Sequence, residues 1–157
     1  MKLRPVLMLS IGVALGGEAF AGQGPQPSIC TRSCWGARAP KCSLSQMSAL
    51  NRAIIHHTAG ASDFNTTGLE NSKTIVRGVQ NLHMDSNGWC DIAYHFLVDK
   101  HGNIFEGRSG SMSSLPKGSH DGHNLNSFGF TLLGYFHPPY NHQAPWAMRD
   151  AIYDVIA

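Results

Sequence analysis

The sequence lacks a strong excess of charge, because 12 Lys and Arg residues stand against 10 Asp and Glu residues. It contains no basic stripe and no run of Lys or Arg interleaved with aromatic residues, the patterns that favour nucleic-acid binding. It also contains no internal repeat and no long low-complexity tract. We therefore expect no nucleic-acid partner.

No apolar run is long enough for a membrane-spanning helix. The run from Val6 to Leu15 falls well short of the ~20 apolar residues that such a helix needs. It follows two basic residues and precedes Ala19-Phe20-Ala21, which is the layout of a secretory signal peptide. We predict a signal peptide over residues 1–21 that is cleaved after Ala21, a secreted extracellular protein, and no membrane span after cleavage.

The rest of the chain is long enough for one domain with a hydrophobic core and too short for two. Residues 22–28 form a Gly/Pro/Gln linker, and residues 29–157 form the predicted domain. Nothing caps the end of the last predicted helix, and Val155 and Ile156 are unusual residues for a frayed polar tail. We therefore expect that the C-terminal part of this domain is missing from the chain.

Four cysteines favour disulfides over a zinc knuckle if the protein is exported: Cys30, Cys34, Cys42 and Cys90. Three pairings are possible, and the sequence does not choose among them. A bridge from Cys34 to Cys42 is the working hypothesis. Both residues lie in an N-terminal segment with Pro and Gly, which a disulfide across a short loop could stabilise. Cys90 is equally well explained as a buried free thiol.

Hydrophobic periodicity predicts both strands and helices. Short apolar runs or alternation predict strands over residues 52–57, 92–98, 104–105 and 127–135. The second and third form a hairpin, and the large residues of its first strand share one face: Ile92, Tyr94, Phe96 and Val98. Helical spacing predicts a helix from about residue 67 to Ser86, ending at Asn87-Gly88, and a last helix that starts at Pro145.

Nine histidines raise the hypothesis of a metal site, because neutral imidazole is the commonest metal ligand as well as a general base. His56 and His57 are neighbours on a predicted strand, so their side chains leave opposite faces of the sheet. Pairing of the predicted strands over residues 52–57 and 92–98 could bring His56 and Tyr94 to one rim. A single strand histidine is more often packed or hydrogen-bonded than a ligand, so the surrounding motifs carry the argument.

Several motifs occur in order along the chain: Arg32–Arg38, Ile54–Gly60, Val79–Met84, Gly88–Leu97 and Gly102–Arg108. His120 follows them, and then Asn126 with Phe128-Gly129-Phe130. Together these motifs resemble the peptidoglycan recognition protein family, relatives of the phage-type zinc amidases. The resemblance covers residues 29–157, and ordered motifs are specific where a single motif would be weak.

The resemblance implies an α/β fold in which a mixed central β-sheet is flanked by α-helices and carries a peptidoglycan-binding groove. In amidase members a zinc ion lies at the floor of the groove, held by two histidines and a cysteine. His56 matches the first histidine, and Tyr94 matches the tyrosine beside the metal, which makes Tyr94 the candidate catalytic residue. The other two ligands belong to a C-terminal stretch that this chain does not contain. Four further histidines match no ligand position, and we do not expect them to substitute: His120, His123, His137 and His142.

Other residues match the groove wall of the family and are candidate substrate-binding residues: Thr58, His83, Trp89, His120 and Asn126. Each also has a structural explanation, such as a turn for Thr58, the core for Trp89 and a loop cap for Asn126. The pair Gly88-Trp89 resembles the pair in members that favour diaminopimelate-type stem peptides.

The resemblance implies a zinc-dependent N-acetylmuramoyl-L-alanine amidase that acts on bacterial peptidoglycan or its muropeptides. Zinc would lower the pKa of its bound water to ~7, and Tyr94 would donate a hydrogen bond to the developing oxyanion. Two alternatives remain open. One is a non-catalytic peptidoglycan-binding protein of innate immunity, and the other is an inactive fragment.

Overall fold

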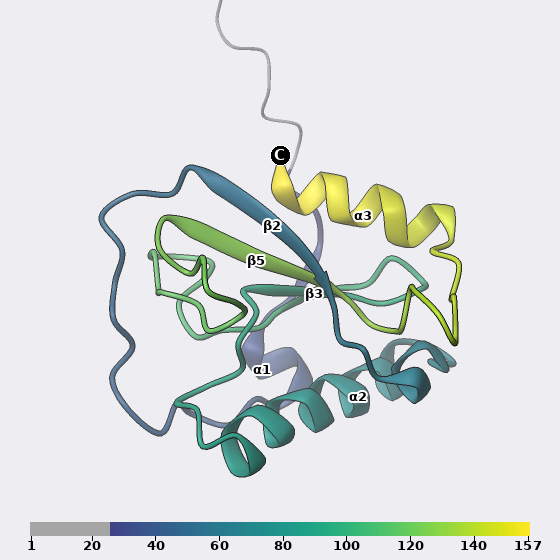
Figure 1. The fold of residues 1–157 in the computed structure, drawn as a ribbon, viewed down its shortest axis with the longest axis horizontal. Helices are drawn as coiled ribbons and strands as arrows, with labels where there is room; N and C mark the ends of the chain where they lie inside the picture. Colours follow the sequence, from purple (N-terminus) through teal and green to yellow (C-terminus); the bar gives the residue numbers. More distant parts are fainter. Residues whose placement is uncertain (1–25) are drawn as a thin grey trace, which may run out of the picture.

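A five-stranded mixed sheet organises residues 26–157, the part of the chain that the computed structural model describes (Figure 1). Its strands follow the spatial order β1-β4-β3-β5-β2. Their bounds are β1 Ile29–Cys30, β2 Arg52–His57, β3 Phe96–Val98, β4 Ile104–Glu106 and β5 Ser127–Leu132. Neighbouring strands are parallel except β3 and β4, which form the predicted hairpin. The predicted signal peptide lies outside the described residues.

Helices cover both faces of the sheet. In Figure 1, α1 (Arg32–Trp35) and α2 (Leu69–Asn81) lie on one side, and α3 (Trp146–Ile156) lies on the other. A 3-10 turn, η1 (Ala61–Phe64), precedes α2, and a π-helical turn, η2 (Leu82–Ser86), continues it. The predicted α/β fold with helices on both faces of a mixed sheet is confirmed. Among residues 26–157, no helix combines the length and the apolar character that crossing a membrane requires.

The alternation of side chains along the central hairpin divides the core into two layers. Phe96 and Val98 of β3 and Ile104 of β4 pack toward α3. Leu97 and Phe105, which are sequence neighbours of these residues, pack with residues of α1 and α2 on the opposite face. All five of these side chains are buried, so the central strands anchor both helical layers.

The predicted strand over residues 92–98 is wrong in its first half. Regular pairing starts only at Phe96, and the alternation breaks just before it. Ile92 and Tyr94 therefore pack on the α2 side, whereas Phe96 and Val98 pack on the α3 side. The break has a clear cause, because the carbonyl groups of Tyr94 and His95 accept hydrogen bonds from Arg108 N and Gly107 N, outside the β3–β4 ladder. This break in the alternation turns the Tyr94 side chain toward α2 and η2.

Two other predicted boundaries shift by a few residues. β5 ends at Leu132 rather than at residue 135, because Gly134 adopts φ 141°, which is incompatible with an extended strand. The last helix begins at Trp146, with Pro145 at its N-cap instead of its first position. The predicted helix over residues 67–86 is confirmed as α2 with η2, and Gly88 follows it with the positive φ of 70° expected after a helix.

The predicted cysteine pairing is wrong. Cys30 is bonded to Cys34, and Cys42 is bonded to Cys90, so Cys90 is not a free thiol. The turn of α1 returns the chain toward β1 and brings Cys34 beside Cys30. The segment around Cys42 runs beside Cys90, where Lys41 N donates a hydrogen bond to Cys90 O at 2.7 Å. The second bridge therefore holds the N-terminal segment to the chain that enters β3.

We predict that removing the Cys42–Cys90 bridge destabilises the protein more than removing the Cys30–Cys34 bridge. The sequence separations are 48 and 4 residues, and the corresponding loop entropies predict losses of about 4 and about 2 kcal/mol. Urea denaturation of the C42A/C90A and C30A/C34A variants, followed by tryptophan fluorescence, measures both free energies of unfolding. A larger loss in C30A/C34A would contradict this prediction.

Candidate functional site

Five ring side chains form a continuous line on the α2 side of the sheet, which we call the ring line: Trp89, His83, Tyr94, His56 and His120. Successive ring centroids lie 4.9, 5.5, 5.5 and 4.9 Å apart. The residues come from five separate segments, namely the loop after η2, η2 itself, the entrance to β3, β2 and the loop before β5. The structure thus brings together five of the seven residues that the motifs single out.

Strand geometry separates the two neighbouring histidines of β2. His56 faces Tyr94 and His120. His57 faces the other way, where its ring packs with Tyr135 and His137 at 5.4 and 5.0 Å. Only His56 therefore belongs to the ring line.

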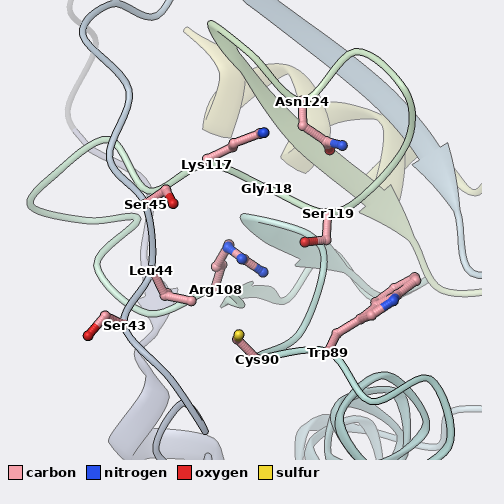
Figure 2. A pocket seen from close by; sticks show the side chains of 10 residues that line it. All are labelled: Ser43, Leu44, Ser45, Trp89, Cys90, Arg108, Lys117, Gly118, Ser119 and Asn124. Carbon is pink, nitrogen blue, oxygen red and sulfur yellow. The ribbon is translucent and has the colours of Figure 1, made fainter.

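A pocket of about 350 Å³ lies at the Trp89 end of the ring line (Figure 2). Figure 2 shows residues 43–45 on one side of it and Trp89 on the other. We call it the cationic pocket, because Arg108 and Lys117 both contribute to its wall. Its full lining is Ser43, Leu44, Ser45, Trp89, Cys90, Arg108, Lys117, Gly118, Ser119 and Asn124.

Arg108 gives the cationic pocket its most constrained charge. The residue is only 5% exposed, and its Nη1 donates a hydrogen bond to Ile92 O at 2.9 Å. Its Nε has no hydrogen-bond partner among the described residues. Burial lowers the pKa of Arg108 and the nearby Asp91 raises it, but a guanidinium group stays charged at neutral pH. The wall of the pocket therefore contains a buried cation.

A second pocket, of about 310 Å³, lies between α2 and the loop after β2, and we call it the threonine pocket. Thr58 lines it together with His83 and Tyr94 of the ring line. The Thr58 hydroxyl also accepts a hydrogen bond from Gly134 N at 3.0 Å, so it holds the end of β5. Since Trp89 lines one pocket and His83 and Tyr94 line the other, the ring line connects the two.

His83 and Tyr94 both reach this surface as neutral hydrogen-bond donors. Ala93 N donates to His83 Nδ1 at 3.1 Å, which places the proton of the neutral ring on Nε2. Burial lowers the pKa of His83 to about 4, with a smaller lowering effect of Arg108. Burial also raises the pKa of Tyr94 above its usual value, so the phenol keeps its proton at neutral pH.

The far end of the ring line holds a cluster with the donor atoms that a metal requires. His56 Nε2 lies 2.9 Å from His120 Nδ1 and 3.9 Å from a carboxylate oxygen of Asp121. Imidazole nitrogens and a carboxylate oxygen are zinc ligands. In residues 26–157 this is the one group of three or more such side chains with its donor atoms gathered within 4.8 Å. The residues present therefore fit the metal that the motifs imply.

Asn126 stands apart from the other candidate residues. It adopts a left-handed conformation with φ 55°, and its carbonyl accepts a hydrogen bond from Asn51 N at 3.1 Å. It lines neither pocket. Asn124 lies in the wall of the cationic pocket instead, as Figure 2 shows. Nothing in the local sequence distinguishes the two asparagines, because their positions depend on how the loop packs.

No sequence pattern pointed to Lys117, and none gave a role to Arg108, Asp121 or Asn124. Arg108 was visible only as the last residue of a motif. Isolated basic, acidic or amide residues in a polar loop carry no signal by themselves, since most such residues are simply solvated. Only the packing of the loop before β5 against β2 and β3 gathers them at one surface.

Comparison with known proteins identifies the family. The sequence model of the N-acetylmuramoyl-L-alanine amidase family matches residues 46–157. The human peptidoglycan recognition protein 3 is 39% identical over 128 residues, which cover 80% of this chain and 35% of the relative. The chain belongs to the peptidoglycan recognition protein family. The Drosophila melanogaster peptidoglycan-recognition protein SC1a is 38% identical over 109 residues, which cover 69% of this chain and 55% of the relative. The chain thus spans only about a third to a half of these relatives.

Solved structures of the family share the fold. The crystal structure of Drosophila peptidoglycan recognition protein SD superposes with a TM-score of 0.72 at 29% identity, covering 82% of this chain and 72% of that one. Peptidoglycan recognition protein LE, solved with tracheal cytotoxin, a monomeric diaminopimelic acid-type peptidoglycan, superposes with a TM-score of 0.69 at 29% identity. That match covers 81% of this chain and 70% of that one.

We predict that lowering the pH from 6.5 to 4 destabilises the protein through His83. Because the pKa of His83 falls to about 4 on folding, the unfolded chain binds the extra proton first in this range, and the free energy of unfolding decreases as the pH falls. The shift corresponds to at most about 3 kcal/mol at pH 4. Urea denaturation at several pH values should show a shallower decrease for His83→Gln than for the unchanged chain. Equal slopes would contradict the assignment of this pH dependence to His83.

Proposed function

We propose that this protein binds bacterial peptidoglycan or its soluble muropeptides across the two pockets and the ring line. The observation that carries the proposal is the unbroken line of rings that connects two pockets of different chemistry. Sugar rings have apolar faces that pack on aromatic side chains, and their hydroxyl and amide groups need nearby hydrogen-bond partners. The neutral N–H of His83 and the hydroxyl groups of Tyr94 and Thr58 supply such partners between the rings.

The cationic pocket would hold a carboxylate of the stem peptide. Arg108 is a cation in the wall of this pocket, and a guanidinium suits a carboxylate in both charge and geometry. Lys117 adds a second positive charge at the rim of the same pocket. The neighbouring Gly88-Trp89 pair and the diaminopimelic acid-type ligand bound by protein LE support the same ligand class.

We further propose zinc-dependent hydrolysis of the amide between the muramic lactyl group and L-alanine. His56 would hold the metal, since it matches the family's first ligand and lies within the described donor cluster. When bound, zinc supplies Lewis-acid polarisation and a water that ionises near pH 7. The protonated Tyr94 phenol would donate a hydrogen bond to the carbonyl oxygen as negative charge develops on it. Addition of water to that carbonyl would release a lactyl carboxylate and the free amine of L-alanine.

A non-catalytic role in innate immunity is the second candidate. It is favoured by the arrangement of the pockets, because the cationic pocket and the Trp89 end of the ring line do not depend on a metal. The two disulfides, Cys30–Cys34 and Cys42–Cys90, fit a secreted protein in an oxidising environment. In this role the protein would retain peptidoglycan and leave its stem peptides attached.

We predict that Trp89→Ala weakens retention on insoluble peptidoglycan by about tenfold or more, a typical loss for an aromatic residue that anchors a ligand. Trp146→Ala is the matched control, because this tryptophan lies on α3 and is 73% exposed. The guanidinium of Arg149 lies over its ring at 4.5 Å. A sedimentation assay with a dilution series of peptidoglycan measures both affinities. Equal retention of the two variants would contradict the assignment of the ring line as the binding surface.

We predict that Tyr94→Phe lowers the rate of stem-peptide release from muropeptides by about 100-fold. Binding weakens by about tenfold at most, because the variant keeps the ring and loses one hydrogen-bond donor. Release is measured as new L-alanine amine groups in the presence of Zn²⁺. If the unchanged chain binds muropeptide and releases no stem peptide, the hydrolytic proposal is wrong and the non-catalytic role stands.

A further inference from the structure

We propose that Asn65 carries an N-linked glycan, which is attached while the chain is being exported. Asn65-Thr66-Thr67 is the one Asn-X-Ser/Thr pattern in the sequence. This pattern marks the acceptor of asparagine-linked glycosylation when its middle residue is not proline. The inference rests on the predicted export of the chain and does not depend on its proposed ligand.

The pattern around Asn65 is distinct from the surroundings of every other asparagine in the chain. Each of the other asparagines is followed, two positions later, by a residue without a hydroxyl group. Asp63 stands two positions before Asn65, so the segment also contains the acidic residue that bacterial asparagine-glycosylating enzymes require there. The segment therefore satisfies the acceptor rules of both the eukaryotic and the bacterial enzymes.

The folded structure places Asn65 at the surface. The residue is exposed and follows η1, outside any regular helix or strand, where its backbone N–H donates a hydrogen bond to Ser62 O at 3.0 Å. Thr67 is exposed as well. Asn65 lines neither the cationic pocket nor the threonine pocket. A bulky, hydrophilic glycan on this residue would therefore be attached outside both pockets.

The residues on either side of Asn65 are held by the fold. The ring of Phe64 stacks on the ring of His142, with 4.4 Å between the centroids. Thr66 is buried, and its carbonyl oxygen lies 3.1 Å from His101 Nε2. The exposed Asn65 side chain can thus carry a large substituent without displacing a core residue. The same contacts would keep the folded segment out of the active site of a transferring enzyme, which must bind the asparagine and the later hydroxyl group together.

These contacts form late in synthesis, because the chain is made from its N-terminus. His101 and His142, which hold the flanking residues, both follow Asn65 in the sequence. Cys90 also follows it, so the Cys42–Cys90 bridge cannot yet enclose the segment when Asn65 emerges. The acceptor segment is therefore unfolded during export, and we place the transfer of the glycan before folding.

The transfer exchanges one bond for another and needs no oxidant or reductant. The carboxamide nitrogen of Asn65 attacks the anomeric carbon of an oligosaccharide that is linked to a polyprenyl pyrophosphate. A carbon–nitrogen bond forms, and the bond between this carbon and the pyrophosphate oxygen breaks. The amide nitrogen loses one proton, and the lipid pyrophosphate leaves.

The first test is mass spectrometry of the peptide that contains Asn65, taken from the chain that its own cells secrete. We expect this peptide to be heavier by a whole glycan. Treatment with a peptide N-glycosidase distinguishes two sources: a eukaryotic glycan linked through N-acetylglucosamine is released and leaves Asp at the position, whereas a bacterial glycan stays attached. Either result supports the proposal, and an unmodified Asn65 in the secreted chain would overturn it.

The second test identifies the attachment site. Asn65→Gln and Thr67→Ala should abolish the glycan, whereas Thr67→Ser should keep it, because serine retains the required hydroxyl group. Asn51→Gln is the matched control, since this exposed asparagine is followed by Arg52-Ala53 and lacks the pattern. A glycan that persists in Asn65→Gln would overturn the assignment.

A third test examines the order of glycosylation and folding. The unmodified full chain, made in a host without the transferring enzyme, is incubated with that enzyme and its lipid-linked donor. We expect transfer to the reduced, unfolded chain and none to the folded chain with both disulfides formed. Equal transfer to the two forms would contradict attachment before folding.

Discussion

Three backbone hydrogen bonds hold the short segment that leads into β3. His95 N donates to Gly129 O on one side, while Gly107 N and Arg108 N donate to the carbonyl groups of His95 and Tyr94 on the other, each at 2.8 Å. These bonds satisfy the buried backbone without extending the regular ladder, and the side-chain alternation is interrupted there. Tyr94 consequently faces α2, whereas Phe96, two residues later, faces α3. Both the α3-facing core and the ring line depend on this interruption.

Histidines show how the number of hydrogen-bond partners sets the role of a buried side chain. His95 uses both ring nitrogens, with Gly129 N at 2.9 Å and Pro116 O at 2.8 Å, and stacks on Phe128. Both ring nitrogens of His95 are thus hydrogen-bonded within the protein, as in a structural core residue. His83 accepts a backbone hydrogen bond at Nδ1, and its Nε2 has no hydrogen-bond partner among residues 26–157. His56 and His120 turn nitrogens toward each other and toward a carboxylate, an arrangement that a cation would stabilise.

The proposed binding and metal-holding parts of the surface are distinct but share a support. Asn124 lines the cationic pocket, and its side chain also fixes the backbone of His120 and Asp121. The loop before β5 therefore shapes both ends of the ring line. Its course is limited by Gly118 and Gly129, where a Cβ atom would lie 2.5 Å from the His120 ring, so a change in this loop would alter the pocket and the donor cluster together.

Sequence alone determined those features that local patterns control. Periodicity placed β2, the β3–β4 hairpin and α2 with η2, because burial on one face repeats every two residues in a strand and about every 3.6 in a helix. The opposite orientation of His56 and His57 followed from the same rule. The ordered motifs identified the family, since they combine several short patterns along most of the chain.

Tertiary structure decided what depends on contacts between distant segments. The pairing of Cys42 with Cys90, the turn of Tyr94 toward α2, and the position of Asn124 rather than Asn126 at the pocket are of this kind. His120 meets His56 only because parallel pairing of β5 with β2 carries the preceding loop over that strand. No local pattern encodes such a meeting, because its energy comes from packing and hydrogen bonds that form only when the whole sheet is assembled.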